Sequence, residues 1–297
     1  MKNIFITGSG GFVGQNIIKN FNSTYEFYRY SKNDEIIINQ DIVLHFAGKA
    51  HDLKNTSNVE EYYIVNTELT KKIVDNFIES EAKVLITLSS VKAVADKLYG
   101  ELTEEYIATP ITHYGKSKLL AEQYILSKNI PEGKRVYILR PCMIHGPGNK
   151  GNLNLLYKLA SKGIPWPLGA FENKRSFCSI DNLIYIIKEL IEREDIPSGV
   201  YNVADDEPLS TNDVISILAE SQCKKAIIWK VSKVLIQSFA KLGDLFRLPL
   251  STERLQKVTE SYLVSNQKIK LAIGKNLQVS SRDGLLKTFN SFHTNVK

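Results

Sequence analysis

The stretch Lys2-Asn3-Ile4-Phe5-Ile6-Thr7-Gly8-Ser9-Gly10-Gly11-Phe12-Val13-Gly14 decides the fold. Its first six residues form a short apolar run typical of a buried strand, and Gln15–Phe21 continues with helical spacing. Glycines in the turn between strand and helix allow a tight bend, close approach of a pyrophosphate and close packing of the helix. The pattern predicts a dinucleotide-binding unit whose phosphates lie at the helix N-terminus. The residues expected to contact the cofactor here are Gly8, Gly11, Phe12, Val13 and Gly14.

The second expected strand, Tyr25–Tyr30, ends where dinucleotide-binding units hold the adenosine ribose. NAD-binding units carry an acidic residue there, which accepts hydrogen bonds from the ribose hydroxyls. In this chain Ser31 and Lys32 follow the strand, and a hydroxyl with a cation suits a 2′-phosphate better than a diol. The sequence therefore favours NADP(H) over NAD, with Asp34 as the residue that could reach the ribose instead.

The alternation of strands and helices is shortened after the second expected strand. Ile36–Ile38 is followed almost at once by another buried strand, Asp41–Ala47, and no full crossover helix fits between them. A long helical stretch, Asn58–Ser80, then leads to the strand Lys83–Leu88. We expect an abbreviated fold in this region.

Small and polar residues follow these strands, at the edge where open α/β sheets bind ligands. Ala47 and Gly48 would let the backbone lie against a cofactor. Ser90 comes directly after the next strand, where a serine either forms a turn or serves a bound substrate.

The segment His113-Tyr114-Gly115-Lys116-Ser117-Lys118 begins a further helical stretch. Tyr114 and Lys118 are four residues apart, so they lie on the same helix face. A tyrosine near its usual pKa of about 10 is a poor acid–base catalyst at neutral pH, and a neighbouring ammonium lowers that pKa. The pair is either an ordinary exposed contact or a proton-exchanging group. Ser90 supplies the third polar group that favours the second interpretation.

Composition excludes several classes of protein. The chain has 297 residues, 43% of them hydrophobic and 24% charged, as in globular proteins. Three cysteines without paired spacing and five scattered histidines predict neither a disulfide framework nor a metal site. No run of about 18 apolar residues and no secretory signal are found, which predicts a cytoplasmic protein with no membrane span. The net charge of +6 is modest, and no nucleic-acid-binding motif is present.

The fold class expected is α/β, a Rossmann-type doubly wound parallel sheet with a smaller C-terminal substrate-binding lobe. The dinucleotide-binding domain is expected over residues 1–163, with a strand near 200–204 rejoining it, and the smaller lobe over residues 164–297. Beyond Ser221 the sequence is Lys-rich and mixed, and we expect an irregular tail.

Taken together, these residues resemble the extended short-chain dehydrogenase/reductases, in the nucleotide-sugar epimerase/dehydratase group. The resemblance covers about residues 2–290. The motifs that carry it are Thr7-Gly8-x-x-Gly11-Phe12-x-Gly14, Ser89-Ser90, Tyr114-x-x-x-Lys118, Leu139-Arg140-Pro141, Gly146-Pro147-Gly148 and Arg175-Ser176-Phe177 with Asp181. Within the group, the chain is most similar to bacterial UDP-hexosamine enzymes of O-antigen and capsule pathways.

The resemblance implies chemistry at C4 of a nucleotide-linked sugar. Tyr114 would exchange a proton with the C4 oxygen while nicotinamide exchanges a hydride with C4. Lys118 would bind the nicotinamide ribose and lower the Tyr114 pKa, and Ser90 would hydrogen-bond the same sugar oxygen. Asn66 matches a family position beside the cofactor.

The resemblance also implies a substrate site. Asn152 and Arg175 match positions that hold the diphosphate of a UDP-sugar, and Arg254 is a second expected contact. Lys92 stands where other members carry a small polar residue, which indicates an altered sugar preference. Family dehydratases carry an Asp-Glu pair after the catalytic hydroxyl, and this chain does not, so a 4,6-dehydratase is disfavoured.

Three functions stay open. The basic end of the second strand favours a 4-keto-sugar reductase that uses NADPH in the synthesis of polysaccharide precursors. The same residues would serve a UDP-sugar 4-epimerase with tightly bound NAD. A regulator that senses dinucleotides without catalysis is the third, and the presence of Ser90, Tyr114 and Lys118 speaks against it. The helices around Asn58–Ser80 and Lys116–Asn129 pair between subunits in relatives, so a homodimer is also expected.

Overall fold

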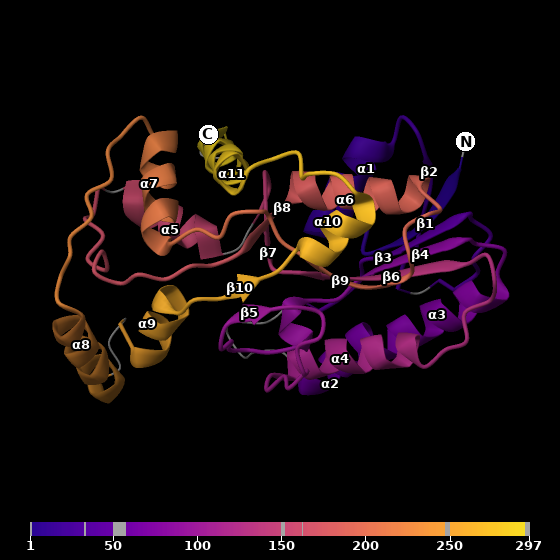
Figure 1. Ribbon diagram of the computed structural model, residues 1–297, viewed down its shortest axis with the longest axis horizontal. Coiled ribbons are helices and arrows are strands. Elements are labelled where there is room, and N and C mark those ends of the chain that lie inside the picture. Colours follow the sequence, from indigo (N-terminus) through magenta and orange to yellow (C-terminus); the bar gives the residue numbers. More distant parts are fainter. Residues whose placement is uncertain are drawn as a thin grey trace.

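A computed structural model of the chain describes residues 2–32, 34–49, 58–149, 152–161, 163–246 and 250–294. A six-stranded parallel sheet forms the centre of its larger part, in the order β2-β1-β3-β4-β6-β9 (Figure 1). The strands are β1 (Asn3–Thr7), β2 (Glu26–Arg29), β3 (Ile42–His45), β4 (Val84–Leu88), β6 (Arg135–Pro141) and β9 (Gly199–Val203). The strand order reverses at β1 and β3, whose carboxyl ends therefore border the crevice in which such sheets bind ligands. The expected Rossmann-type α/β fold is confirmed.

The remaining elements complete the chain. The α-helices are α1 (Phe12–Phe21), α2 (Val59–Tyr63), α3 (Leu69–Glu79), α4 (His113–Leu126), α5 (Asn152–Ser161), α6 (Ile180–Glu192), α7 (Thr211–Ser221), α8 (Lys233–Phe246), α9 (Thr252–Thr259), α10 (Gln267–Ile273) and α11 (Ser281–Thr294). Short parallel strand pairs are β5 (Glu101–Leu102) with β10 (Leu263–Val264) and β7 (Met143–His145) with β8 (Phe177–Ser179). A π-helical turn, η1 (Ile64–Glu68), and a 3-10 turn, η2 (Val91–Ala93), lie beside the candidate site. In the described ranges, no helix is long and apolar enough to cross a membrane.

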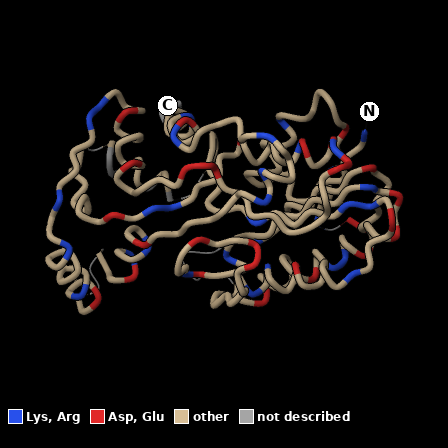
Figure 2. Tube along the Cα trace, in the orientation of Figure 1, with Lys and Arg blue, Asp and Glu red and all other residues tan. Residues whose placement is uncertain are grey.

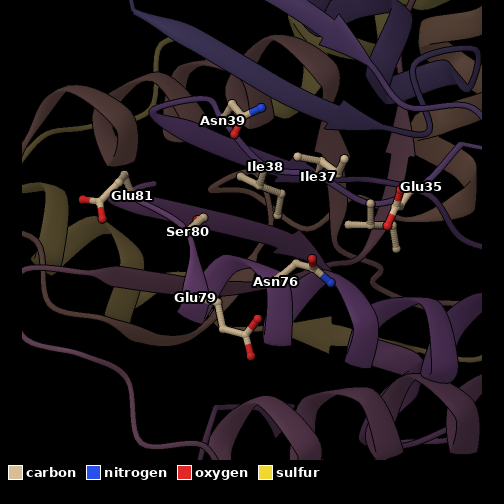
Figure 3. Close-up of a pocket in the computed structure, with 9 residues that line it drawn as sticks. Glu35, Ile37, Ile38, Asn39, Asn76, Glu79, Ser80 and Glu81 are labelled. Atoms are coloured by element: carbon tan, nitrogen blue, oxygen red, sulfur yellow. The ribbon is translucent and has the colours of Figure 1, made fainter.

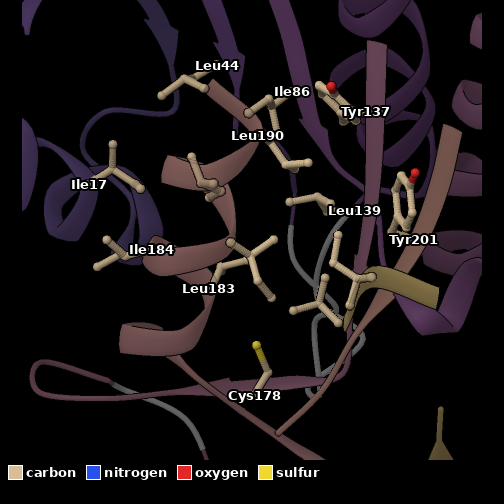
Figure 4. Close-up of a cluster of buried hydrophobic side chains, with 14 of the residues drawn as sticks. Ile17, Leu44, Ile86, Tyr137, Leu139, Cys178, Leu183, Ile184, Leu190 and Tyr201 are labelled. Atoms are coloured by element: carbon tan, nitrogen blue, oxygen red, sulfur yellow. The ribbon is translucent and has the colours of Figure 1, made fainter. Parts of the chain in front are cut away.

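Both faces of the sheet are buried, because strand side chains alternate between two helical layers. On one face, Leu44, Ile86 and Leu139 pack with Ile17 of α1 and Leu183 of α6 (Figure 4). The opposite face packs on α3 and α4. Its buried residues include Phe5, Val43, Ile73, Phe77, Leu85, Ile125 and Ile138. The sheet is therefore the middle of three layers, with α1 and α6 on one side and α3 and α4 on the other.

The glycine turn after β1 is fixed by backbone packing. Gly8 has a φ of 71°, and a Cβ there would lie 2.5 Å from the Ala47 amide nitrogen. A Cβ on Gly14 would lie 2.3 Å from the Gly8 carbonyl oxygen. Larger residues at either position would push apart the turn, the loop after β3 and the first turn of α1.

The segment between β2 and β3 contains no helix among its described residues, as the sequence predicted. Ile38 packs from it into the core with Phe5 and Val43. A pocket of about 500 Å³ lies between this segment and the end of α3, lined by Ile37, Asn76 and Glu79 among others (Figure 3). It also includes residues that precede β3 and β4, so it lies at the amino ends of these strands, away from the carboxyl ends that bind ligands.

The part of the chain beyond Ser221 differs from the irregular tail expected. Its described residues form four helices, α8 to α11. α10 returns to the large sheet and packs beside β9, whereas α11 packs on α7 and β8. Helix α6 and strand β9 both follow residue 163, yet α6 packs on the large sheet and β9 pairs with its strand β6. The chain therefore crosses more than once between the large sheet and the smaller C-terminal part. The domain division at residue 163 stays a prediction.

A buried ion pair joins α4 to β6 behind the candidate site. The Arg140 guanidinium donates two hydrogen bonds to Glu122 from Nε, at 3.0 and 3.1 Å, and a third from Nη2. Only 8% of the Arg140 side chain and 2% of the Glu122 side chain are exposed. The Ser89 hydroxyl donates a further bond to the same carboxylate. Removing one partner would leave a charge buried without its counterion.

Arg140→Leu should therefore lower the free energy of unfolding by about 3–5 kcal/mol. The matched control is Lys257→Leu, which breaks an exposed ion pair with Glu253 and should cost less than about 1 kcal/mol. Urea unfolding of both variants provides the measurement. Equal losses in the two variants would contradict the importance of the buried pair.

Candidate active site

Three segments meet at the crevice beside the glycine turn. A Cβ on Gly48, in the loop after β3, would lie 3.0 Å from Lys118 Nζ and 3.2 Å from Asn66 Oδ1. Asn66 lies in the π-helical turn η1, and its side chain is fully buried. Its Oδ1 accepts a 2.8 Å hydrogen bond from the Lys49 amide, and its Nδ2 donates a 3.0 Å bond to Ser117 Oγ. The π turn therefore ties the loop after β3 to helix α4.

A chain of hydrogen bonds runs beneath this loop. The Ala47 amide donates to Thr7 Oγ1 at 3.0 Å, and Thr7 Oγ1 lies 2.7 Å from His45 Nδ1. His45 Nε2 lies 2.8 Å from Thr70 Oγ1, which in turn donates a 2.7 Å bond to the Asn66 carbonyl. Thr70 uses its proton on that carbonyl, so the His45 ring donates from Nε2 and accepts at Nδ1. Burial and the charge of Lys118 lower the His45 pKa to about 3, which keeps the ring neutral.

Ser90 and Tyr114 meet at the carboxyl end of β4. Ser90 is the N-cap of η2, and Tyr114 lies in the first turn of α4, whose N-cap is Thr112. A hydrogen bond joins the two hydroxyl groups, and the Tyr62 ring makes an edge-on contact with the Tyr114 ring at 6.3 Å between centroids. The two side chains predicted to share a sugar oxygen are thus brought together.

The Tyr114 pKa does not follow the sequence-based prediction. Burial raises the Tyr114 pKa, and the nearby Tyr62 raises it further, while only the Ser90 hydrogen bond lowers it. Lys118 directs its ammonium at the Leu88 carbonyl. The Tyr114 pKa is therefore raised by its surroundings, whereas the sequence had predicted a lowered value.

Lys118 is a buried ammonium. Its side chain lies one turn beyond Tyr114 on α4, and Nζ donates a 2.8 Å hydrogen bond to the Leu88 carbonyl at the end of β4. Burial lowers the Lys118 pKa to about 8, although the Glu122 carboxylate acts in the opposite direction. The site thus holds a cation next to the small residue Gly48, at the carboxyl edge of the sheet.

A second cationic group, Lys92, lies two residues after Ser90 in the turn η2. Lys92 donates a 2.8 Å hydrogen bond from Nζ to the Asp96 carbonyl and lies 4.2 Å from the centroid of the Tyr262 ring. Burial lowers the Lys92 pKa, and the charge of Arg175 lowers it further. Burial also lowers the Arg175 pKa, and the Arg175 guanidinium donates to the Lys257 carbonyl of α9. Lys92 and Arg175 therefore form a partly buried positive region between the two parts of the molecule.

Four other residues, predicted to contact the cofactor or the substrate, are Ser31, Lys32, Arg254 and Asn152. Ser31 and Lys32 are exposed at the carboxyl end of β2, and the Ser31 amide donates a 2.8 Å hydrogen bond to Asp34 Oδ2. Arg254 is exposed on α9, three residues before Lys257. Asn152 is the first residue of α5, and its side chain lies outside the described parts of the structure.

The sequence assigned no role in the site to His45, Thr70 or Tyr262, and Thr7 entered only as the first residue of the glycine motif. For Thr7 and His45 a signal existed: both are polar residues at the ends of apolar strands, and they are register partners in β1 and β3. Tyr262 had no such signal, because it lies in a mixed segment. Its hydroxyl donates a 2.7 Å bond to the Ala95 carbonyl and so fixes the ring beside Lys92.

Comparison with known proteins agrees with this geometry. The 3-beta hydroxysteroid dehydrogenase/isomerase family matches residues 29–226. The UDP-glucose 4-epimerase of Vibrio cholerae is 29% identical, over 98% of this chain and 95% of the relative. An N-acetyl-alpha-D-glucosaminyl-diphospho-ditrans,octacis-undecaprenol 4-epimerase of Escherichia coli O157:H7 is 25% identical, over 75% of this chain and 73% of the relative.

Solved structures share the fold. The UDP-glucuronic acid 4-epimerase of Bacillus cereus in complex with NAD has a TM-score of 0.74 and 20% identity, covering 99% of this chain and all of that one. RMD of Pseudomonas aeruginosa complexed with NADPH has a TM-score of 0.74 and 18% identity, covering 100% of both chains. With the Ser90, Tyr114 and Lys118 arrangement and a family match over residues 29–226, the protein is an enzyme of the extended short-chain dehydrogenase/reductase type and belongs to the 3-beta hydroxysteroid dehydrogenase/isomerase family.

Proposed function

We propose that the protein is a 4-epimerase of a UDP-linked sugar that keeps a bound NAD. The observation that carries the proposal is the meeting of Ser90, Tyr114 and Lys118 at the carboxyl end of β4, beside the glycine-lined crevice. The relatives from Vibrio cholerae and Bacillus cereus support this choice of reaction, since both are named 4-epimerases.

The residues of the crevice fit a dinucleotide. Gly11 is the N-cap of α1 and offers no side-chain cap, so the first amides of this helix are available to a diphosphate. Gly48 leaves room beside Lys118 Nζ, where a ribose hydroxyl would accept a hydrogen bond. The backbone of Ala47, held by Thr7, would line the same space. When bound, the dinucleotide supplies the acceptor and donor of a hydride.

The protein's own residues would move the proton. A sugar hydroxyl placed at Ser90 and Tyr114 would lie within reach of both groups, and Tyr114, ionised to the phenolate, would take its proton and become the neutral phenol. Because burial raises the Tyr114 pKa, this step needs a positive charge nearby. Lys118, one turn away on the same helix face, is the cation that α4 offers.

The substrate diphosphate would lie toward the positive region. Arg175 reaches α9 and is partly buried, and a planar guanidinium suits a diphosphate. Lys92 is held between the Asp96 carbonyl and the Tyr262 ring, where it would face the sugar. Arg254 and Asn152 are proposed as further contacts to the diphosphate.

The turn after β2 supports NAD and therefore the epimerase. The Asp34 carboxylate folds back onto the Ser31 amide, which brings an acidic group to the place where Ser31 and Lys32 had favoured NADP(H). A carboxylate accepts hydrogen bonds from ribose hydroxyls and repels a 2′-phosphate. The alternative is a 4-keto-sugar reductase with external NADPH, which exposed Lys32 and the NADPH complex of the Pseudomonas aeruginosa relative favour.

Purified protein, given UDP-glucose or UDP-N-acetylglucosamine and no added cofactor, should form the C4 epimer. Acid release and mass spectrometry of the bound dinucleotide should give NAD. A 4-keto-sugar reductase that uses external NADPH would behave differently. It would form no C4 epimer without added cofactor, and it would oxidise NADPH when a 4-keto-sugar nucleotide is supplied.

Tyr114→Phe should lower turnover by about 10²–10⁴-fold, because the phenolic proton route is lost. Dinucleotide binding should stay nearly unchanged. The control is Tyr124→Phe on the same helix, whose hydroxyl bonds Asp75 instead, at 2.7 and 2.9 Å, and which should keep full turnover. Undiminished turnover in Tyr114→Phe would require a different acid–base group, and a wild-type protein that binds dinucleotide without any turnover would favour a sensing regulator.

Lys118→Met should change how stability depends on pH in protein stripped of dinucleotide. The folded Lys118 pKa of about 8 lies below the usual value of 10.5, so the unfolded chain binds more protons between these values. Wild-type stability should therefore rise with pH across that window relative to the variant, by roughly 2–3 kcal/mol. Chemical unfolding at pH 7 and pH 10 provides the measurement. A constant difference between the two proteins would show that the ammonium is not desolvated.

A further inference from the structure

Helix α8 exposes an apolar face. Six side chains on it are between 47 and 73% exposed: Val234, Leu235, Phe239, Leu242, Leu245 and Phe246. Their spacing of three and four residues places them in one sector about 140° wide. We call these six residues the α8 apolar face.

The other residues of α8 form a buried stripe and a polar stripe. Ile236, Ala240 and Gly243 are buried on the opposite side, where Ile236 and Ala240 pack with Leu168 and with Leu255 of α9. A third, polar stripe consists of Lys233, Gln237, Lys241 and Asp244. The core therefore uses only the narrow buried stripe, and the wider apolar sector is exposed. The helix itself lies at one end of the molecule (Figure 1).

Lysines lie on the polar stripe of α8 and along the segment that leads from α7 to it. The exposed lysines of segment 222–246 are Lys224, Lys225, Lys230, Lys233 and Lys241, and its acidic residue is Asp244 (Figure 2). Asp244 accepts hydrogen bonds from the Thr252 amide and hydroxyl, so its charge is directed at the start of α9. Among the described residues, these five lysines form no ion pair. The segment thus combines a large apolar sector with a net charge of +4, from five lysines and one aspartate.

We propose that the α8 apolar face docks on the surface of an anionic lipid bilayer. A helix with an apolar sector of Leu and Phe and a lysine-bearing polar stripe lies in the plane of a membrane interface. Trp229, which precedes the helix and is 56% exposed, is of the residue type enriched at that depth. At 14 residues, α8 is too short to span the hydrocarbon core, so it lies on the bilayer.

The charge of this segment favours an anionic bilayer over a second copy of the chain as the partner of the α8 apolar face. A second copy would bring another segment of net charge +4 to the same face, and like charges disfavour that contact. An anionic headgroup layer complements the same lysines. The buried side of α8 packs on α9, the helix that carries Arg254, so docking would hold the region proposed for the substrate diphosphate beside the membrane.

The test uses the whole chain of 297 residues, as purified, and extruded vesicles. The protein should sediment with vesicles of equimolar phosphatidylcholine and phosphatidylglycerol, and much less with vesicles of phosphatidylcholine alone. Added salt should weaken the binding to the anionic vesicles. Leu235→Ser with Phe239→Ser should reduce binding to anionic vesicles about tenfold or more. The matched control, Ile107→Ser with Leu271→Ser, removes two side chains that are about 80% exposed elsewhere and should bind like wild type.

Fluorescence gives a second readout. The chain has two tryptophans, so Trp166→Phe leaves Trp229 as the reporter, and its emission should shift to the blue on addition of anionic vesicles. Thermal midpoints should show that all variants are folded. The proposal is overturned if the protein does not bind anionic vesicles, or if the Leu235/Phe239 variant binds as wild type does. It is equally overturned if sedimentation velocity shows self-association that this variant abolishes, without vesicle binding.

Discussion

The buried ammonium of Lys118 is the constraint on which the rest of the site depends. It donates its hydrogen bond to the Leu88 carbonyl at the end of β4, and burial lowers its pKa to about 8. A charge this far from water requires polar partners, and the chain provides the Leu88 carbonyl at the end of β4 and the Glu122 carboxylate on α4 itself. That requirement sets where α4 packs, and α4 carries Tyr114.

Two polar systems hold the elements around this charge. The first is the chain of hydrogen bonds from Thr7 through His45 and Thr70 to Asn66, which connects β1, β3 and α3 with the π turn. The second is the buried ion pair of Glu122 and Arg140, which joins α4 to β6. Fully satisfied buried networks specify a single arrangement, since any shift leaves a polar group without a partner. The two systems therefore tie helix α4, which carries Tyr114 and Lys118, to the central sheet and to the π turn.

Much of the fold could be predicted from local patterns. The strand, glycine turn and helix at the start of the chain are continuous in sequence, and backbone packing at Gly8 and Gly14 requires those residues. Tyr114 and Ser90 were also predictable, because helix spacing and strand ends place them. The Tyr114 pKa was not, since it depends on burial and on Tyr62, which lies about fifty residues away in sequence. The helices beyond Ser221 were missed for a similar reason. In α8 the exposed sector is apolar, so the usual contrast between a buried apolar face and a polar surface is absent.

The central claim is that a hydride leaves and returns at C4 of a bound sugar while Tyr114 handles the proton. A UDP-sugar deuterated at C4 tests it most directly, with product analysed by NMR in ordinary water. The account predicts that the C4 epimer retains its deuterium fully, because the hydride never exchanges with solvent. Loss of the label to water would mean that C4 is deprotonated instead, and would contradict the account.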